Sequence, residues 1–119
     1  MAEGEEDRRR TIHVRLAEPA REGDVAALKK WLEREHRLEE LARDRTVLIH
    51  ERAAPDGHGN PMGAGTEIVL LLAGWASNRM FDEVIAQTRR AVEAWRVNRR
   101  SVESGEPPEA EIRPGVDER

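Results

Sequence analysis

Apolar and polar side chains alternate along residues 11–17, which is the two-residue period of a strand with one buried face. Residues 46–50 are mostly β-branched or apolar, with Val47 and Ile49 on one face, and predict a second strand. Residues 66–75 include six successive apolar side chains, which fit either a strand buried on both faces or a buried helix. We favour the helix for this segment.

Two segments carry apolar residues at the three- and four-residue spacing of an amphipathic helix. The first starts near Asp24, which can cap it, and extends to Leu41 with a kink near His36. The second starts after Ser77 and Asn78, either of which can cap it. Its inward face consists of Phe81, Val84, Ile85, Thr88, Val92 and Trp95.

These elements predict one α+β domain over residues 11–102, because 119 residues leave no room for a second core. We expect a two-layer sandwich of a small three-stranded sheet with two to three helices, in the order β-α-β-α-α-(β). Residues 1–10 are highly charged and predict a disordered leader, and residues 53–65 predict a long exposed loop. Residues 103–119 predict a polar tail, with a short edge strand near 110–113 as the third strand.

Composition narrows the classes of partner. The net charge of -4 disfavours binding to nucleic acid, for which a basic excess over the whole domain is typical. The longest apolar stretch, residues 68–73, is far shorter than the roughly 20 residues of a membrane-spanning helix, so we expect no membrane contact. The chain has no cysteine and no apolar signal segment near its start, and we expect it in the cytoplasm.

Candidate chemistry is sparse. The glycine-rich loop 57–65 could hold a phosphate, but it lacks both the Lys-Ser/Thr pair of a P-loop and the Rossmann glycine spacing. Glu51, Asp56 and His58 could form an acid–base set, yet no nucleophile accompanies them. We therefore expect a protein without catalytic residues, metal or cofactor. The histidines do not have the spacing of metal ligands; they are His13, His36, His50 and His58.

The three tryptophans and the arginines of the second helix are the remaining residues to interpret, and the arginines have two interpretations. Trp31 and Trp95 lie on apolar helix faces and should interlock over the sheet, whereas Trp75 follows Gly74 at a junction and should be partly exposed. The basic end of the helix is either a solvated face or a docking patch for an acidic partner surface. Its candidate contact residues are Arg89, Arg96, Arg99 and Arg100.

Three motifs follow one another along the chain: Leu28-x-x-Trp31-Leu32, Pro61-Met62-Gly63-Ala64 and Val92-x-x-Trp95-x-x-x-Arg99-Arg100. Their order, over about residues 11–100, resembles the first type of the effector-associated constant component family. Members of that family are small non-enzymatic components found beside variable effector modules in bacterial defence and conflict systems.

The resemblance implies an adaptor or signal-coupling role, with a protease, an NTPase, a TIR-like protein or its regulator as the partner. The contact surfaces would be the arginine-rich helix face and the 53–65 loop, including Met62 and Gly63, with exposed Trp75 as a further contact. The alternative is a domain that senses a nucleotide or another small molecule through loop 57–65. An enzyme remains a third hypothesis, which would need His50, Asp56 and His58 to cluster in a cleft.

Overall fold

Four strands and three helices follow one another in a computed structural model that describes residues 8–17, 23–53, 66–102 and 108–118. The elements are β1 (Arg8–Leu16), α2 (Asp24–Arg34), α3 (His36–Arg43), β2 (Val47–Ala53), β3 (Thr66–Leu72), α4 (Asn78–Val102) and β4 (Ala110–Glu118). The α+β class expected from the sequence is confirmed, with one more strand than predicted.

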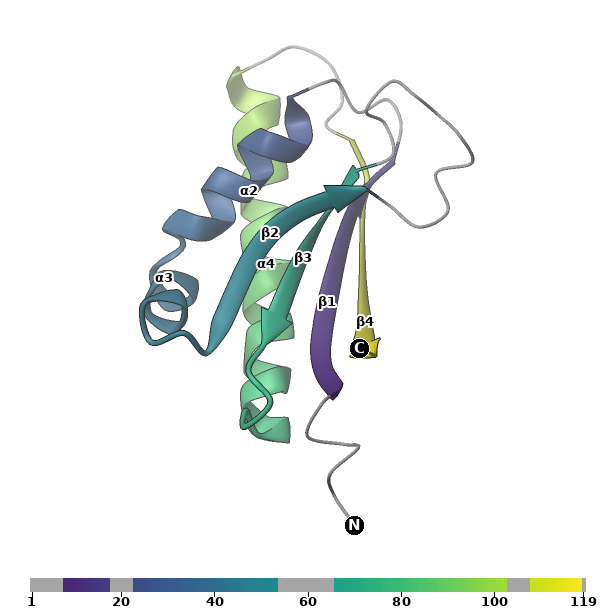
Figure 1. The fold of residues 1–119 in the computed structure, drawn as a ribbon. Coiled ribbons are helices and arrows are strands. Elements are labelled where there is room, and N and C mark those ends of the chain that lie inside the picture. Colours follow the sequence, from purple (N-terminus) through teal and green to yellow (C-terminus); the bar gives the residue numbers. More distant parts are fainter. Residues whose placement is uncertain (1–7, 18–22, 54–65, 103–107, 119) are drawn as a thin grey trace.

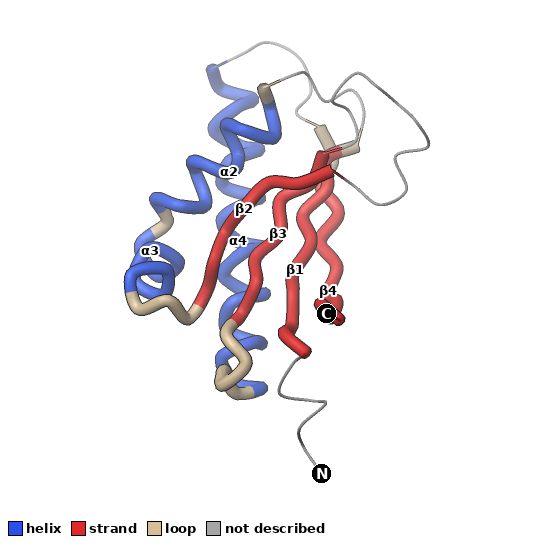
Figure 2. The backbone as a smooth tube through the Cα atoms, viewed as in Figure 1, coloured by secondary structure: helices blue, strands red, loops and turns tan. Residues whose placement is uncertain are grey.

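The strands form one antiparallel sheet in the order β2-β3-β1-β4. All three helices cover one face of this sheet (Figure 1), so the molecule has two layers. Ile12 of β1 pairs with Leu70 on one side and with Pro114 on the other, which places β1 in the interior of the sheet (Figure 2). The connectivity is that of the split βαβ, or ferredoxin-like, arrangement, with the first crossover divided between α2 and α3.

The apolar core lies between the sheet and the helices. β1 and β3 send alternate side chains into it, and each helix contributes the apolar positions that recur at helical spacing. The members with the least exposure are Ile12, Val14, Leu28, Leu32, Leu38, Val47, Ile68, Leu70, Leu72 and Val84.

The helix expected over residues 66–75 is wrong, because residues 66–72 form strand β3. Ile68 and Leu70 face the helices, while Val69 lies on the opposite face with only 1% of its surface exposed. A strand in the interior of a sheet whose side chains are buried on both faces can have a continuous apolar sequence, and its seven residues fit a strand better than a helix.

The sheet also extends beyond the predicted bounds at both ends of the chain. β1 begins at Arg8 instead of Thr11, and β4 continues to Glu118 instead of ending near residue 113, because these two strands pair along their whole length. Their charged side chains conceal the pairing from a hydrophobicity pattern, since the backbone supplies the hydrogen bonds. Residues 103–107 lie outside the described residues, and so do loop residues 54–65.

The helix boundaries follow local hydrogen bonds. Ser77 Oγ accepts from the Met80 N–H at 3.1 Å, which confirms the predicted cap of α4. The predicted kink is a complete break at Glu35, whose carboxylate accepts from the Leu38 N–H at 2.9 Å and caps α3. Asp24 does not cap α2, because Gly23 occupies that position with φ of 101°. Within the described ranges, no helix is both long and apolar enough to cross a membrane.

Candidate functional site

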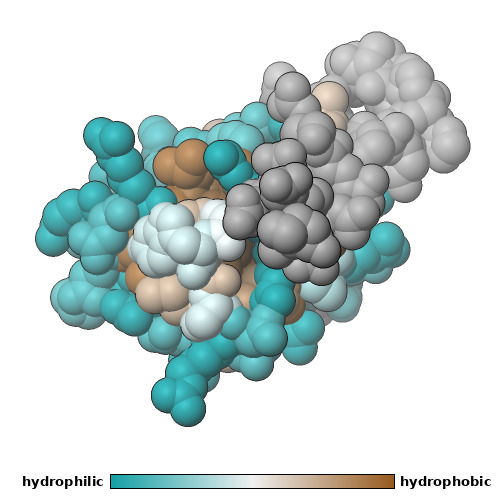
Figure 3. Space-filling view, turned by 60° about the horizontal axis from the view of Figure 1, so that its bottom comes forward, coloured by the Kyte–Doolittle hydropathy of each residue, from teal (hydrophilic) through white to brown (hydrophobic). Residues whose placement is uncertain are grey.

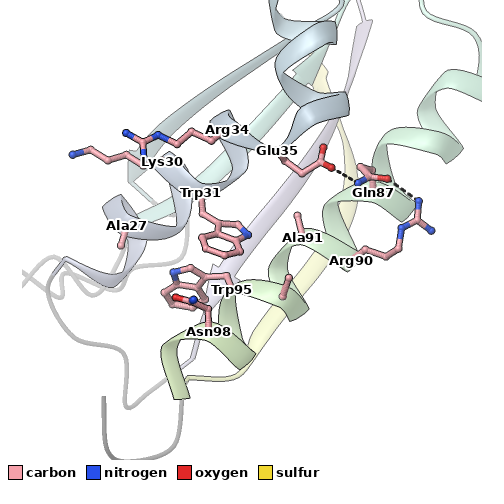
Figure 4. A pocket seen from close by; sticks show the side chains of 11 residues that line it. Ala27, Lys30, Trp31, Arg34, Glu35, Gln87, Arg90, Ala91, Trp95 and Asn98 are labelled. Atoms are coloured by element: carbon pink, nitrogen blue, oxygen red, sulfur yellow. Dashed lines mark hydrogen bonds between the residues drawn. The ribbon is translucent and has the colours of Figure 1, made fainter. Parts of the chain in front are cut away.

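A groove of about 610 Å³ lies between α2 and α4. Its apolar lining includes Trp31 from α2 and Trp95 from α4, whose indoles lie side by side (Figure 4). Trp95 is only 5% exposed, whereas Trp31 is half-buried and reaches the solvent. The volume falls in the range typical of sites that bind a small molecule or a short peptide segment.

Small residues keep this groove open. Ala91 and Ala94 line it from α4, and Ala27 lines it from α2. Trp31 lies three residues after the buried Leu28, so it occupies the margin of the apolar stripe and meets Trp95 across the helix interface. The methyl side chains of the alanines are too small to fill the space beside the indole rings, so a hollow remains there.

A chain of polar side chains lies at one side of the groove (Figure 4). The Gln87 amide donates to the Glu35 carboxylate, and Arg90 donates to Gln87 Oε1 at 2.7 Å. Glu35 also caps α3, so its carboxylate already accepts hydrogen bonds from two donors of the protein. This arrangement connects the α2–α3 break to the middle of α4 and fixes the position of the Glu35 carboxylate at the side of the groove.

The groove is locally basic although the whole chain is acidic. Lys30, Arg34 and Arg90 line it, and among the described residues of its lining the one carboxylate is that of Glu35. All three cationic residues are exposed. Apolar walls with a cationic margin suit a ligand that is both apolar and anionic, because the rings bury its carbon atoms while the cations attract its charge.

A second polar cluster lies on the sheet face opposite the helices. Glu67 of β3 is 1% exposed, and its carboxylate lies 3.1 Å from His13 Nδ1, 3.4 Å from Arg15 and 3.6 Å from Arg52. His13 Nε2 lies 2.8 Å from Thr11 Oγ1. The order hydroxyl, imidazole, carboxylate is the one that hydrolytic triads use.

Access argues against nucleophilic chemistry at this cluster. Thr11 is 1% exposed, and the hollow of about 260 Å³ beside the cluster is lined by His13 and Glu67 but not by Thr11. A Cβ added at Gly115 of β4 would lie 2.8 Å from Thr11 Oγ1, so the next strand covers the hydroxyl closely. We therefore assign to this network the role of satisfying the polar groups of β1 and β3 on this face of the sheet.

The predicted docking arginines do not form one surface. Arg99 is only 10% exposed at its side chain and pairs with Asp24 at 3.1 Å, with its guanidinium 5.9 Å from the centroid of the Trp95 ring. Arg96 donates to the Pro108 carbonyl at 2.9 Å and also pairs with Glu93. Both side chains thus hold the C-terminal part of α4 to neighbouring segments.

The other contact residues predicted from the sequence are not held by such ion pairs or lie outside the described part of the structure. Arg89 is exposed on α4, and the expected exposure of Trp75, between β3 and α4, is confirmed at 66%. Arg100 belongs to α4, but its side chain lies outside the described part, as do Met62 and Gly63.

Sequence reasoning missed the contribution of α2 to the site. Lys30 and Arg34 stand one helical turn apart beside Trp31, a spacing that is visible in the sequence. Their role depends on α4 lying next to α2, which no local pattern encodes.

An ion pair fixes α3 to α4. Arg37 Nε lies 2.6 Å from Glu83 Oε2, and an Arg37 terminal nitrogen lies 3.1 Å from Glu40. The hydrogen bond from Arg37 lowers the pKa of Glu83 below its ordinary value, and the hydrogen bonds to Glu83 and Glu40 raise the pKa of Arg37 further. Both groups are partly exposed, so this pair orients the helices more than it stabilises the fold.

Comparison with known proteins leaves the site to be interpreted from its geometry. No protein-family model, no curated protein and no solved structure matches the chain. In the part of the chain that the structure describes, no three histidine or acidic side chains gather in a way that would hold a metal ion. The ferredoxin-like connectivity does not assign an activity, because this arrangement hosts many unrelated functions.

Proposed function

We propose that the protein is a non-enzymatic adaptor of bacterial conflict systems, which binds an acidic, partly apolar segment of an effector protein in the groove between α2 and α4. The observation that carries this proposal is the combination of two tryptophans with three cations in one groove. The partner would be a cytoplasmic protease, NTPase or TIR-like protein, or its regulator.

The sequence motifs support the same surface. Trp31 belongs to the first motif of the family resemblance and Trp95 to the last, and both line the groove. Indole rings supply a large contact area at a small cost in conformational entropy, which is why tryptophan is frequent among the residues that dominate binding energy.

The spacing of the cations favours a helical segment of the partner. Lys30 and Arg34 stand at i and i+4 on α2, so two acidic side chains one turn apart on a bound helix could each reach one of them. Arg90 lines the groove from α4 and would pair with a third carboxylate. The apolar face of the same helix would cover the indoles.

The groove is a better docking surface than the arginine face predicted from the sequence. A partner at Arg96 or Arg99 would have to compete with the Pro108 carbonyl and the Asp24 carboxylate. The alternative of a small-molecule sensor depends on loop 57–65, which lies outside the described residues, and nothing in the described part favours it.

Recovery of a partner from native cell extract tests the proposal. The tagged wild-type protein would be compared with Ala94→Trp, which fills the groove from an exposed position, and with Arg34→Glu, which reverses one of its charges. Arg43→Glu is the matched control, because Arg43 is an exposed arginine on α3 that does not line the groove. We expect a protease, NTPase or TIR-like protein with the wild type and with the control only.

Two results would contradict the proposal. The first is recovery of the same partner by Ala94→Trp at wild-type yield, since a filled groove cannot accept a helix. The second is the absence of any specific protein, provided that circular dichroism shows the bait to be folded.

A further inference from the structure

The two edges of the sheet differ in their protection. β4 forms one edge and carries Pro114, a residue that discourages further pairing because it has no N–H. β2 forms the other edge, and in the described chain it pairs only with β3. Its sequence VLIHERA contains neither proline nor glycine. The outer edge of β2 therefore offers backbone N–H and C=O groups to another strand.

An apolar hollow of about 190 Å³ adjoins this edge. Leu48 and Leu71 are paired residues of β2 and β3 on the sheet face opposite the helices, and Trp75 follows in the next turn. Leu48 is 50% exposed and Trp75 is 66% exposed. Figure 3 turns this end of the molecule forward and shows pale and brown surface with hydrophilic side chains around it.

The charged residues that line the hollow, within the part of the chain that the structure describes, are both basic. They are Arg9 from β1 and Arg45 from the turn before β2, and no acidic residue is among the described residues of the lining. Both arginines are exposed. In a chain with a net charge of -4, such a site favours an acidic ligand over a basic one.

Arg45 occupies a position that normally belongs to glycine. It follows α3 with a φ of 62°, in the left-handed region. The Arg45 N–H donates to the Ala42 carbonyl, and the Thr46 N–H donates to the Leu41 carbonyl at 2.8 Å, which is the Schellman pattern of a helix end. Glycine adopts this conformation without strain, whereas an L side chain does not. An arginine here costs stability, and a functional side chain would explain its presence.

We propose that this sheet-edge patch, made of Leu48, Leu71, Trp75, Arg9 and Arg45, binds an extended acidic segment of a second protein that adds to β2 as a strand. Backbone hydrogen bonds with β2 hold the segment, and every second side chain faces the hollow. An apolar side chain of the segment covers Leu48 and Trp75, while a carboxylate pairs with Arg45. The patch lies on the sheet face opposite the helices, whereas the groove lies between α2 and α4 in the helical layer. The adaptor therefore has two independent docking surfaces.

Selection from a phage-displayed library of random nine-residue peptides tests this proposal with the full chain as bait. We expect the enriched peptides to alternate apolar residues with Asp or Glu. A synthetic peptide of the enriched sequence should slow amide hydrogen exchange along residues 47–53, which side-chain docking alone would not do.

The decisive variant is Arg45→Gly. It should weaken the binding of that peptide at least tenfold, because a charge-assisted hydrogen bond is lost, while the melting temperature stays equal or rises. Arg43→Ala removes the same charge two residues away, outside the hollow, and should leave the affinity within twofold. Arg34→Glu in the helix groove should also leave it unchanged.

Four results would overturn the proposal. They are a selection that enriches no peptide, enriched peptides without acidic residues, wild-type affinity in Arg45→Gly, and exchange protection in α2 and α4 instead of β2. Sedimentation velocity adds a fifth: self-association that Trp75→Ala abolishes would make the occupant a second copy of the chain.

Discussion

The ion pair between Asp24 and Arg99 gives a quantitative test of the role of the arginines on α4. Each side chain is 10% exposed, and the charged atoms lie 3.1 Å apart. Arg99→Met keeps most of the apolar volume beside Trp95 and removes the guanidinium from the Asp24 carboxylate. Breaking a buried pair from one side typically costs 3–5 kcal/mol, and the residual exposure places this pair near 3 kcal/mol.

A loss of about 3 kcal/mol should lower the midpoint of urea unfolding by about 2 M, at an m-value of about 1.5 kcal/mol/M. The far-UV circular dichroism signal is the appropriate readout, since Trp95 fluorescence would respond to the substitution itself. Arg43→Met on the exposed end of α3 is the control, with an expected loss under about 0.5 kcal/mol.

The double variant Asp24→Asn/Arg99→Met sharpens the test. It no longer contains a buried carboxylate without its guanidinium, so it should be more stable than the sum of the two single losses predicts. A cost below about 1 kcal/mol for Arg99→Met would refute the structural role and return Arg99 to the candidates for docking.

Three further substitutions probe other contacts. Gly115→Ala should cost about 1–3 kcal/mol in urea unfolding, because the added methyl would lie 2.8 Å from Thr11 Oγ1; a neutral result would mean that β4 shifts freely. Ser77→Ala should lower the stability by about 1 kcal/mol through loss of the α4 cap, measured by thermal unfolding, and an unchanged melting temperature would exclude that role. Since the pKa of Glu83 is lowered in the folded protein, its bond to Arg37 stabilises the fold above about pH 4.3 and is lost as the pH falls through the folded pKa. Glu83→Gln should therefore be slightly less stable than wild type at pH 7 and equal to it in strong acid; a gap that persists at pH 2 would contradict this.

The elements that the sequence predicted well are those whose own residues determine them. β1 alternates because one face is buried, and α4 repeats apolar residues at helical spacing over most of its length. β3 could not be distinguished from a helix, because burial on both faces removes the alternation that identifies a strand. β4 was mostly missed because its pairing with β1 depends on backbone groups, while its side chains are largely polar.

For the candidate sites too, features determined by the local sequence were predicted, whereas features that depend on contacts between distant segments were not. The burial of Trp95 and the exposure of Trp75 followed from their positions relative to helix faces and glycine. The groove could not be predicted in this way, because it forms where Trp31 from α2 lies near Ala91 from α4, two residues that are far apart in the sequence. The partners of Arg96 and Arg99 are equally non-local, so the sequence alone presented both residues as free charges.

The place of β1 in the sheet has a consequence for how the chain folds. Among the described elements this strand is the first in the sequence, yet both of its neighbours, β3 and β4, are made later, and β4 follows all the other described elements. Contacts between such distant segments form slowly, because the loop that they close carries a large entropy cost. During synthesis, β1 would remain unpaired until β3 leaves the ribosome, and one of its edges would stay open until β4 has left the ribosome as well.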